Sequence, residues 1–222
     1  MAIPRLQLVE LEDLRWFPAT IRDLATDYLR FAQERLRFHA AVLPLLHDLV
    51  TSTGATTIVD LCAGGGGPMP MVMRDLGALG WRGEVVLTDR YPNVAAFREA
   101  AATAPGSIGW EAEPVDARAI PATLRGVRTL WNAFHHFAPA DAIAVLRDAA
   151  RAGDPVVVLE LPDRRLVRGI LPFVLVTPWA VLLATPFIRP FRWRRLLWTY
   201  VVPLVPLTCW WDGIVSALRA YD

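Results

Sequence analysis

Short apolar runs and helical stretches alternate through the middle of the chain, from about residue 55 to residue 163. Runs that are apolar on both faces and are joined by helical crossovers are typical of a parallel sheet. The right-handedness of such crossovers leaves few topologies open. The pattern therefore predicts an α/β, doubly wound, mostly parallel sheet. The expected strands are 57–61, 84–88, 108–112, 127–132 and 155–161, and the expected helices between them are 69–79, 94–102 and 140–150.

The first 54 residues have a different, helical pattern. Apolar residues recur at spacings of three and four between positions 21 and 36, and most of the charged residues lie between them. Pro44 predicts a break or bend in this helix, and Thr53-Gly54 predicts its end. We expect residues 1–54 to form an N-terminal helical cap.

Composition narrows the choice of partner and compartment. A chain of 222 residues suffices for one α/β domain with an appendage, and its net charge of +1 gives no reason to expect nucleic acid as a partner. Hydrophobic residues make up 54% and tryptophan occurs nine times, which suggests a large interface or contact with a membrane. Cys62 and Cys209 form neither a disulfide framework nor a zinc spacing, and the N-terminus does not resemble a signal peptide. We expect a cytoplasmic location.

The strongest chemical signal lies at residues 58–68. An apolar strand ends at Asp60 and runs into the glycine-rich turn 64–67, which opens a helix. Glycine permits positive φ and lets a ligand approach the backbone, and the helix N-terminus adds free N–H groups. The pattern favours a nucleotide-like ligand at this turn. The alternative is a glycine-rich turn that binds nothing.

The spacing of the glycines argues against a pyrophosphate ligand. The pattern G-x-G-x-x-G started at Gly64 meets Met69 where glycine is required, and started at Gly65 it meets Pro70. No Gly-Lys-Ser/Thr follows the glycines, so no P-loop is present. A nicotinamide-dependent, NAD(P) oxidoreductase on the same fold is therefore only an alternative.

The motif resembles that of the class I S-adenosylmethionine-dependent methyltransferases, whose first motif is an acidic residue followed by glycines at alternating positions. Asp60, Gly64 and Gly66 match it, while Cys62 stands where the family usually has glycine. The resemblance implies a Rossmann-like fold and S-adenosyl-L-methionine as the cofactor. It also implies that Asp60, Ala63, Gly64 and Gly66 contact that cofactor.

Two later acidic residues extend the resemblance. Asp89, with Arg90 beside it, follows the second expected strand, where the family holds the ribose hydroxyls. Asp116, with Ala117 beside it, follows the third, where the family contacts the adenine amino group. Each aspartate alone could be a helix cap or turn residue. Their order after successive strands makes the set more specific than its members.

The segment 131–137 follows the fourth strand, at the sheet edge where ligands bind in such folds. The resemblance implies that Asn132 orients the methionine portion or a substrate. His135 or His136 could accept a proton from the methyl acceptor. The alternatives are an asparagine that satisfies backbone groups and a histidine pair packed under the next helix. We expect no metal, because His39 and His47 lie in the N-terminal helices and no Cys/His/Asp cluster completes a ligand set.

The C-terminal region resembles that of a group of bacterial methyltransferases with an apolar, proline-interrupted insertion and a Trp-Asp-Gly-x-x-Ser-x-Leu-Arg-x-Tyr segment, here residues 211–221. This group has no established substrate, so the resemblance indicates the enzyme class alone. Such chains continue into a helix and two closing strands, whereas this sequence ends at Asp222. We therefore expect a sheet without its closing strands. Two explanations are open: the chain is a fragment, whose activity would be in doubt, or another element covers the exposed edge of the sheet.

An apolar, uncharged run at 169–188 is about long enough to span a bilayer, and a second run covers 196–211. A single crossing would place the basic segment 189–195 outside, against the positive-inside tendency, and lipid-facing helices tolerate prolines poorly. We expect an amphipathic or re-entrant hairpin on the cytosolic face of the membrane. A lid over the active site and a homodimer interface through 164–211 are the alternatives. The interrupting prolines are at 172, 178, 186, 190, 203 and 206.

Together these patterns predict three regions: a helical cap (1–54), a cofactor-binding Rossmann-like core (55–163) and an apolar helical region (164–222). The predicted function is methyl transfer from S-adenosylmethionine to a small or lipophilic acceptor, peripheral to the inner face of the membrane if the hairpin binds lipid. The alternative from another class is a non-catalytic, membrane-associated protein with a relic cofactor site, suggested by Cys62 and the expected lack of closing strands.

Overall fold

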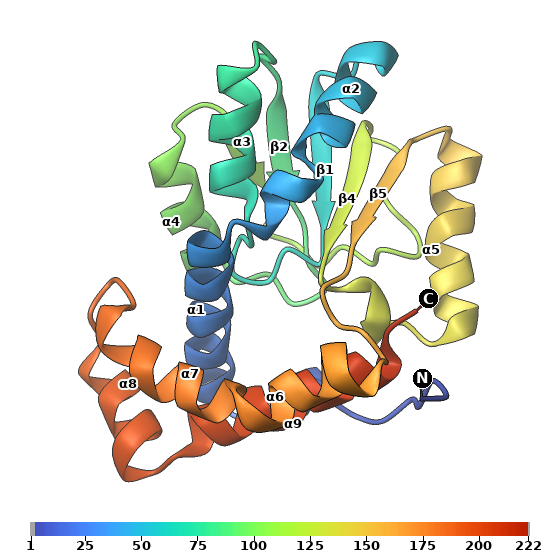
Figure 1. Cartoon of the computed structure of the whole chain (residues 1–222). Coiled ribbons are helices and arrows are strands. Elements are labelled where there is room, and N and C mark those ends of the chain that lie inside the picture. The colour runs from blue at the N-terminus through green and yellow to red at the C-terminus, as the bar shows by residue number, and fades with distance from the viewer. Residues whose placement is uncertain (1–2, 222) are drawn as a thin grey trace. The chain divides into compact units, whose positions relative to one another are not determined.

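The computed structural model describes residues 3–221, which fold into two compact units. Unit 1 comprises the chain up to Phe31 together with the segment from Glu160 onward, and unit 2 comprises Ala32–Leu159. Figure 1 shows the sheet of unit 2 and the helices of unit 1.

Unit 2 contains a five-stranded parallel sheet. Its strands are β1 (Thr57–Leu61), β2 (Glu84–Leu87), β3 (Ile108–Trp110), β4 (Val127–Trp131) and β5 (Val156–Leu159). Their order is β3-β2-β1-β4-β5, and every neighbouring pair is parallel. The β4 strand is buried along its whole length, so its side chains have to be apolar or have hydrogen-bond or ion-pair partners inside the protein. The predicted α/β, doubly wound, Rossmann-like sheet is confirmed, and within residues 3–221 β5 forms one of its edges.

Helices cover both faces of this sheet. They are α2 (Leu43–Thr53), α3 (Met69–Ala78), α4 (Val94–Thr103) and α5 (Pro139–Ala152), with short 3-10 turns η2 (Phe38–Ala41) and η3 (Phe134–His136). Right-handed crossovers place α3 and α4 on one face and α5 on the other, as Figure 1 shows. The α2 helix contacts α3, so part of the N-terminal region belongs to the sheet unit. Among the core residues are Leu46, Ile58, Met69, Val72, Leu76, Val85, Leu87, Phe97 and Val127.

The helix boundaries follow local signals in the sequence. The side chain of Asn93 caps α4 by accepting a hydrogen bond from the Ala96 N–H (3.1 Å). Gly54 and Gly153 end α2 and α5 in the left-handed conformation. The break expected near Pro44 lies earlier in the chain. The α1 helix ends at Leu36, and the next residue, Arg37, has a φ of 48°. Pro44 lies in the first turn of α2, where a missing N–H costs nothing.

Unit 1 is built from the N-terminal and C-terminal segments of the chain. It contains the 3-10 turn η1 (Leu11–Asp13), the first part of α1 (Ala19–Leu36), α6 (Leu171–Leu175), α7 (Thr177–Ala184), α8 (Trp193–Leu196) and α9 (Leu204–Arg219). The π-helical turns η4 (Leu166–Ile170) and η6 (Leu197–Val201) and the 3-10 turn η5 (Thr185–Phe187) connect these helices. The α9 helix packs against α6, α7 and η1. The buried cluster of this unit consists of Ile21, Leu24, Ala25, Val181, Val205 and Cys209.

The two units cut across the three regions expected from the sequence. Residues 32–54, assigned to the N-terminal cap, belong to the sheet unit, and the residues before them belong with the C-terminal helices. The reason is packing, since Leu46 and Val50 join the sheet core while Ile21 and Leu24 join α7 and α9. A helical period shows that one face is apolar but does not identify the element that covers it.

No single helix among residues 3–221 is both long and apolar enough to cross a membrane. Two helix pairs pass that test by length and composition only when taken together. They are Leu166–Leu175 with Thr177–Phe187, bent by 48°, and Trp193–Val201 with Leu204–Arg219, bent by 73°.

A buried arginine ties β4 to the segments around it. Arg128 is 2% exposed, and its guanidinium donates to the carboxylates of Asp148 (2.6 Å) and Asp154 (2.9 Å). The Arg125 guanidinium donates to the other oxygen of Asp154 (2.9 Å). Because Asp154 is also buried, its charge depends on these cations.

Replacing Arg128 with alanine leaves the Asp154 carboxylate buried beside one exposed cation. We expect Arg128→Ala to lower the free energy of unfolding by about 3–5 kcal/mol, measured by urea denaturation at pH 7. Arg147→Ala, on the exposed face of α5, should change it by less than about 0.5 kcal/mol. A loss below about 1 kcal/mol in Arg128→Ala would show that the pairs contribute little.

Candidate functional site

The turn between β1 and α3 lies at the carboxyl edge of the sheet and has an unusual backbone. The φ angle is positive at Cys62 (57°), Gly64 (53°), Gly66 (90°) and Gly67 (49°). A β-carbon at Gly66 would lie 3.0 Å from the β-carbon of Ala100, so α4 packs closely against this turn. A β-carbon at Gly64 would meet nothing within 4 Å, and a ligand can approach the backbone there.

Asp89 connects three of the segments that the sequence predicts at the site. Its carboxylate accepts hydrogen bonds from the backbone N–H of Gly64 (2.8 Å) and from that of Tyr91 (2.8 Å). Its own carbonyl accepts from the N–H of Val115 (2.8 Å), directly before Asp116. The glycine turn, the end of β2 and the segment after β3 are therefore joined through one residue.

Asp60 lies inside the sheet, directly below the turn. Its side chain is buried and accepts a hydrogen bond from the Thr129 hydroxyl of β4 (2.6 Å). Burial raises its pKa to about 8, although the Thr129 hydrogen bond lowers it, and the negative charge of Asp89 raises it further. The structure thus places Asp60 where it supports the turn, with its carboxyl group away from solvent.

Asp116 is paired with a cation that the sequence did not single out. The Arg118 guanidinium donates to both of its carboxylate oxygens (2.9 and 2.6 Å) and also to Asp141 (2.8 Å). Hydrogen bonds from Arg118 lower the pKa of Asp116 to about 2. The Asp116 carboxylate is therefore ionised and fixed in orientation, and Ala117 beside it is buried.

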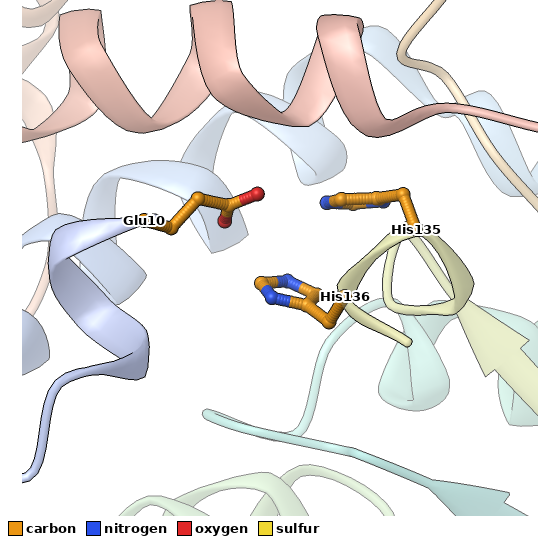
Figure 2. Close-up of side chains that lie close together, drawn as sticks. All are labelled: Glu10, His135 and His136. Carbon is orange, nitrogen blue, oxygen red and sulfur yellow. The ribbon is translucent and has the colours of Figure 1, made fainter. Parts of the chain in front are cut away.

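Asn132 and the histidine pair follow β4. Asn132 has a φ of 53°, and its backbone N–H donates to the Leu159 carbonyl of β5 (2.7 Å). Asparagine tolerates this left-handed conformation better than most residues. The imidazoles of His135 and His136 lie together on η3, with ring centroids 4.4 Å apart and planes tilted by 31° (Figure 2). Glu10, drawn in the same view, belongs to unit 1.

Apart from Asp60, which lies within β1, the sequence-predicted site residues follow the carboxyl ends of their strands. Ala63 reinforces the edge, because its N–H donates to the Thr88 carbonyl at the end of β2 (2.9 Å). The Arg90 guanidinium lies 6.0 Å from the centre of the neighbouring Tyr91 ring. Residues near this edge that the sequence analysis did not single out are Tyr91, Arg118 and Thr129. The sequence could have revealed Arg118, because a cation two residues after Asp116 can fold back on that carboxylate. The sequence alone could not have revealed Thr129, because its hydrogen bond with Asp60 depends on the order of the strands in the sheet.

Comparison with known proteins adds a distant likeness in fold. No protein-family model matches the chain, and no curated protein matches it. Among solved structures it is similar to an O-methyltransferase family protein from Burkholderia thailandensis, at 21% sequence identity and a TM-score of 0.42. The match covers 69% of this chain and 54% of the other, so the chain spans about half the length of that protein. This likeness is too distant to assign a function.

The buried Asp60 carboxyl makes stability depend on pH. Between about pH 4 and pH 8 the native state keeps a proton that the unfolded chain has lost. The free energy of unfolding should therefore fall as the pH rises through this window, by up to about 1.4 kcal/mol per pH unit from this group. We expect Asp60→Asn, which keeps an acceptor oxygen for Thr129, to lack this fall.

The measurement is urea denaturation of both proteins from pH 5 to pH 8.5, with the difference between them plotted against pH. Asp212 also has a raised pKa, of about 7, but it is present in both proteins and cancels in the difference. Parallel curves would show that Asp60 is ionised in the native state.

Cys62 has a left-handed backbone conformation (φ 57°), which glycine adopts without steric cost. A β-carbon in this conformation costs about 1–2 kcal/mol, and the greater freedom of glycine in the unfolded chain offsets part of that. We expect Cys62→Gly to be more stable than Cys62→Ala by about 0.5–1 kcal/mol in chemical denaturation. Both variants lose the sulfur atom, so the comparison isolates the backbone. Equal stability would mean that the turn relaxes without strain.

Proposed function

We propose that this chain is a class I S-adenosylmethionine-dependent methyltransferase whose unit 2 holds the cofactor at the carboxyl edge of the sheet. The observation that carries the proposal is Asp89, which accepts a hydrogen bond from Gly64 and joins the glycine turn to the segment before Asp116. A carboxylate beside a glycine turn with open backbone suits a ribose attached to a small nucleoside.

The chain's own groups fit such a nucleoside. Each carboxylate oxygen of Asp89 holds one backbone hydrogen bond and keeps acceptor capacity for a ribose hydroxyl. Asp116 is ionised and oriented by Arg118, so it offers an acceptor to an adenine amino group, with Ala117 beside it. Gly64 lets the ligand approach the backbone without meeting a side chain, while Gly66 lets α4 pack closely against the turn.

When bound, S-adenosylmethionine supplies an electrophilic methyl group on a sulfonium sulfur. The role of the protein is then mainly to position the acceptor in line with that methyl group and to exclude water. Asn132, at the end of β4, would orient the methionine portion or the acceptor. His135 or His136 would take the proton of an acceptor that has to lose one. We expect the acceptor to be a small or lipophilic molecule.

A nicotinamide-dependent oxidoreductase is less compatible with the turn. Met69 begins α3 and is buried, so the third glycine of the dinucleotide pattern is replaced by a side chain in the core. Among residues 3–221, no feature of the carboxyl edge favours the nicotinamide cofactor over an adenosyl cofactor.

Binding of S-adenosylhomocysteine, measured by isothermal titration calorimetry, tests the proposal. We expect micromolar affinity for the wild-type chain. Asp89→Asn keeps one acceptor oxygen, for the Gly64 N–H, but loses the negative charge and the acceptor for the Tyr91 N–H. It should weaken binding about tenfold, which corresponds to about 1.4 kcal/mol.

The matched control is Asp48→Asn, an exposed carboxylate on α2, which should leave the affinity unchanged. NAD and NADP are titrated in parallel. Absence of S-adenosylhomocysteine binding by folded protein would contradict the cofactor assignment, and tight NAD(P) binding instead would favour the oxidoreductase. Equal affinity in Asp89→Asn would mean that Asp89 shapes the turn without contacting the ligand.

A further inference from the structure

The positive charge of unit 1 is concentrated in one segment of the sequence. Residues 164–211 contain seven arginines and no aspartate, glutamate or lysine, so the segment carries a formal charge of +7. Because the whole chain carries +1, all the other residues together carry −6. By unit, the formal charge is +3 for unit 1 (12 arginines, nine acidic residues) and −2 for unit 2 (11 arginines, 13 acidic residues).

The most exposed part of this segment combines arginines with aromatic rings. We call residues 187–194 the basic-aromatic tip, which runs from the end of η5 into α8. Within it Phe187, Phe191 and Trp193 are 64%, 61% and 65% exposed, and Arg189 and Arg194 are exposed as well. Large aromatic side chains left this open to water mark a surface that has a partner.

An apolar stripe continues from the tip along α7. Val176, Trp179, Leu183 and Phe187 are exposed at spacings of three and four, which places them on one side of α7 and η5. The opposite side carries Val181, which is buried in the core of unit 1. Figure 1 shows α7 and α8 at the same end of this unit, and η5 contacts both helices.

Buried ion pairs hold the tip in place. The Arg195 guanidinium donates to the carboxylate of Asp27 (2.6 Å) and to the carbonyls of Ile188 (2.9 Å) and Pro190 (3.1 Å). The Arg192 guanidinium donates to the same Asp27 carboxylate (3.2 Å). These contacts fix the backbone on both sides of Arg189. In the part of the chain that the structure describes, no carboxylate pairs with Arg189 or with Arg194.

We propose that the basic-aromatic tip and the α7 stripe dock unit 1 on the surface of a bilayer rich in anionic phospholipid. Aromatic rings are favoured at the headgroup level, and arginine pairs with lipid phosphates. The surface lies along the membrane rather than crossing it, because the apolar helices are short and bent relative to one another. The charges of the exposed Arg189 and Arg194, with which no carboxylate among residues 3–221 pairs, favour an anionic bilayer over a neutral one. This inference is independent of the proposed methyl transfer, because no residue of unit 2 contributes to it.

Vesicle flotation tests the docking with the full chain. The vesicles are pure phosphatidylcholine or phosphatidylcholine with 30% phosphatidylglycerol, at about 0.1 M salt, where the Debye length is about 10 Å. We expect binding to the anionic vesicles that weakens as the salt is raised, and little binding to the neutral ones. Phe187→Ala/Trp193→Ala should weaken it about tenfold or more, and so should Arg189→Gln/Arg194→Gln.

Matched controls come from unit 2. Leu45→Ala removes an equally exposed apolar residue (64%) and Arg147→Gln an exposed arginine, and both variants should bind as the wild type does. Circular dichroism shows that each variant is folded. Absence of binding to anionic vesicles, equal binding to neutral ones, or tip variants that bind like the controls would each overturn the proposal. Sedimentation velocity showing a dimer dissociated by the tip variants would identify a second copy as the partner.

Discussion

The backbone turn after β1 is the constraint on which the candidate site depends. Four residues between positions 62 and 67 have positive φ, so the chain leaves the sheet and enters α3 within a few residues. This tight path directs the Gly64 N–H toward Asp89, and Asp89 in turn holds the segment before Asp116. A wider turn would separate these three segments, which are far apart in sequence. The geometry of the site is therefore set by backbone conformation before any ligand is considered.

Asp60 shows how the sheet supports that turn. A fully buried carboxyl group is costly when charged, and its raised pKa keeps it protonated over much of the neutral range. The hydrogen bond with Thr129 joins β1 to β4, the neighbouring strands at which the order of the sheet changes direction. Asp89 instead uses both carboxylate oxygens to accept backbone hydrogen bonds, from the N–H of Gly64 and from that of Tyr91. The two acidic residues of the motif thus differ in role because their environments differ.

The sequence predicted the sheet well, because its strands are apolar on both faces and are separated by amphipathic helices. Five strands were found where expected, although β3 is shorter and ends at Trp110. The carboxyl-edge location of Asp89, Asp116 and Asn132 followed from the parallel topology alone. Side-chain partners could not be predicted in the same way. The Arg118–Asp116 pair and the Asp60–Thr129 bond depend on distances between elements, and so does the division of the N-terminal helices between two units.

The prolines of unit 1 explain how so apolar a segment avoids forming one long helix. Pro172, Pro178 and Pro186 each lie in the first turn of a new short helix, where proline is tolerated. At the restart by Pro178, the helix Thr177–Phe187 is bent by 48° from Leu166–Leu175, and α6 and α7 both pack against α9 while α7 keeps an apolar side exposed. A continuous helix of the same composition would have to bury all of its sides or enter lipid. Proline spacing, together with the buried Arg195 that fixes the following loop, therefore converts a hydrophobic sequence into a surface with one apolar face.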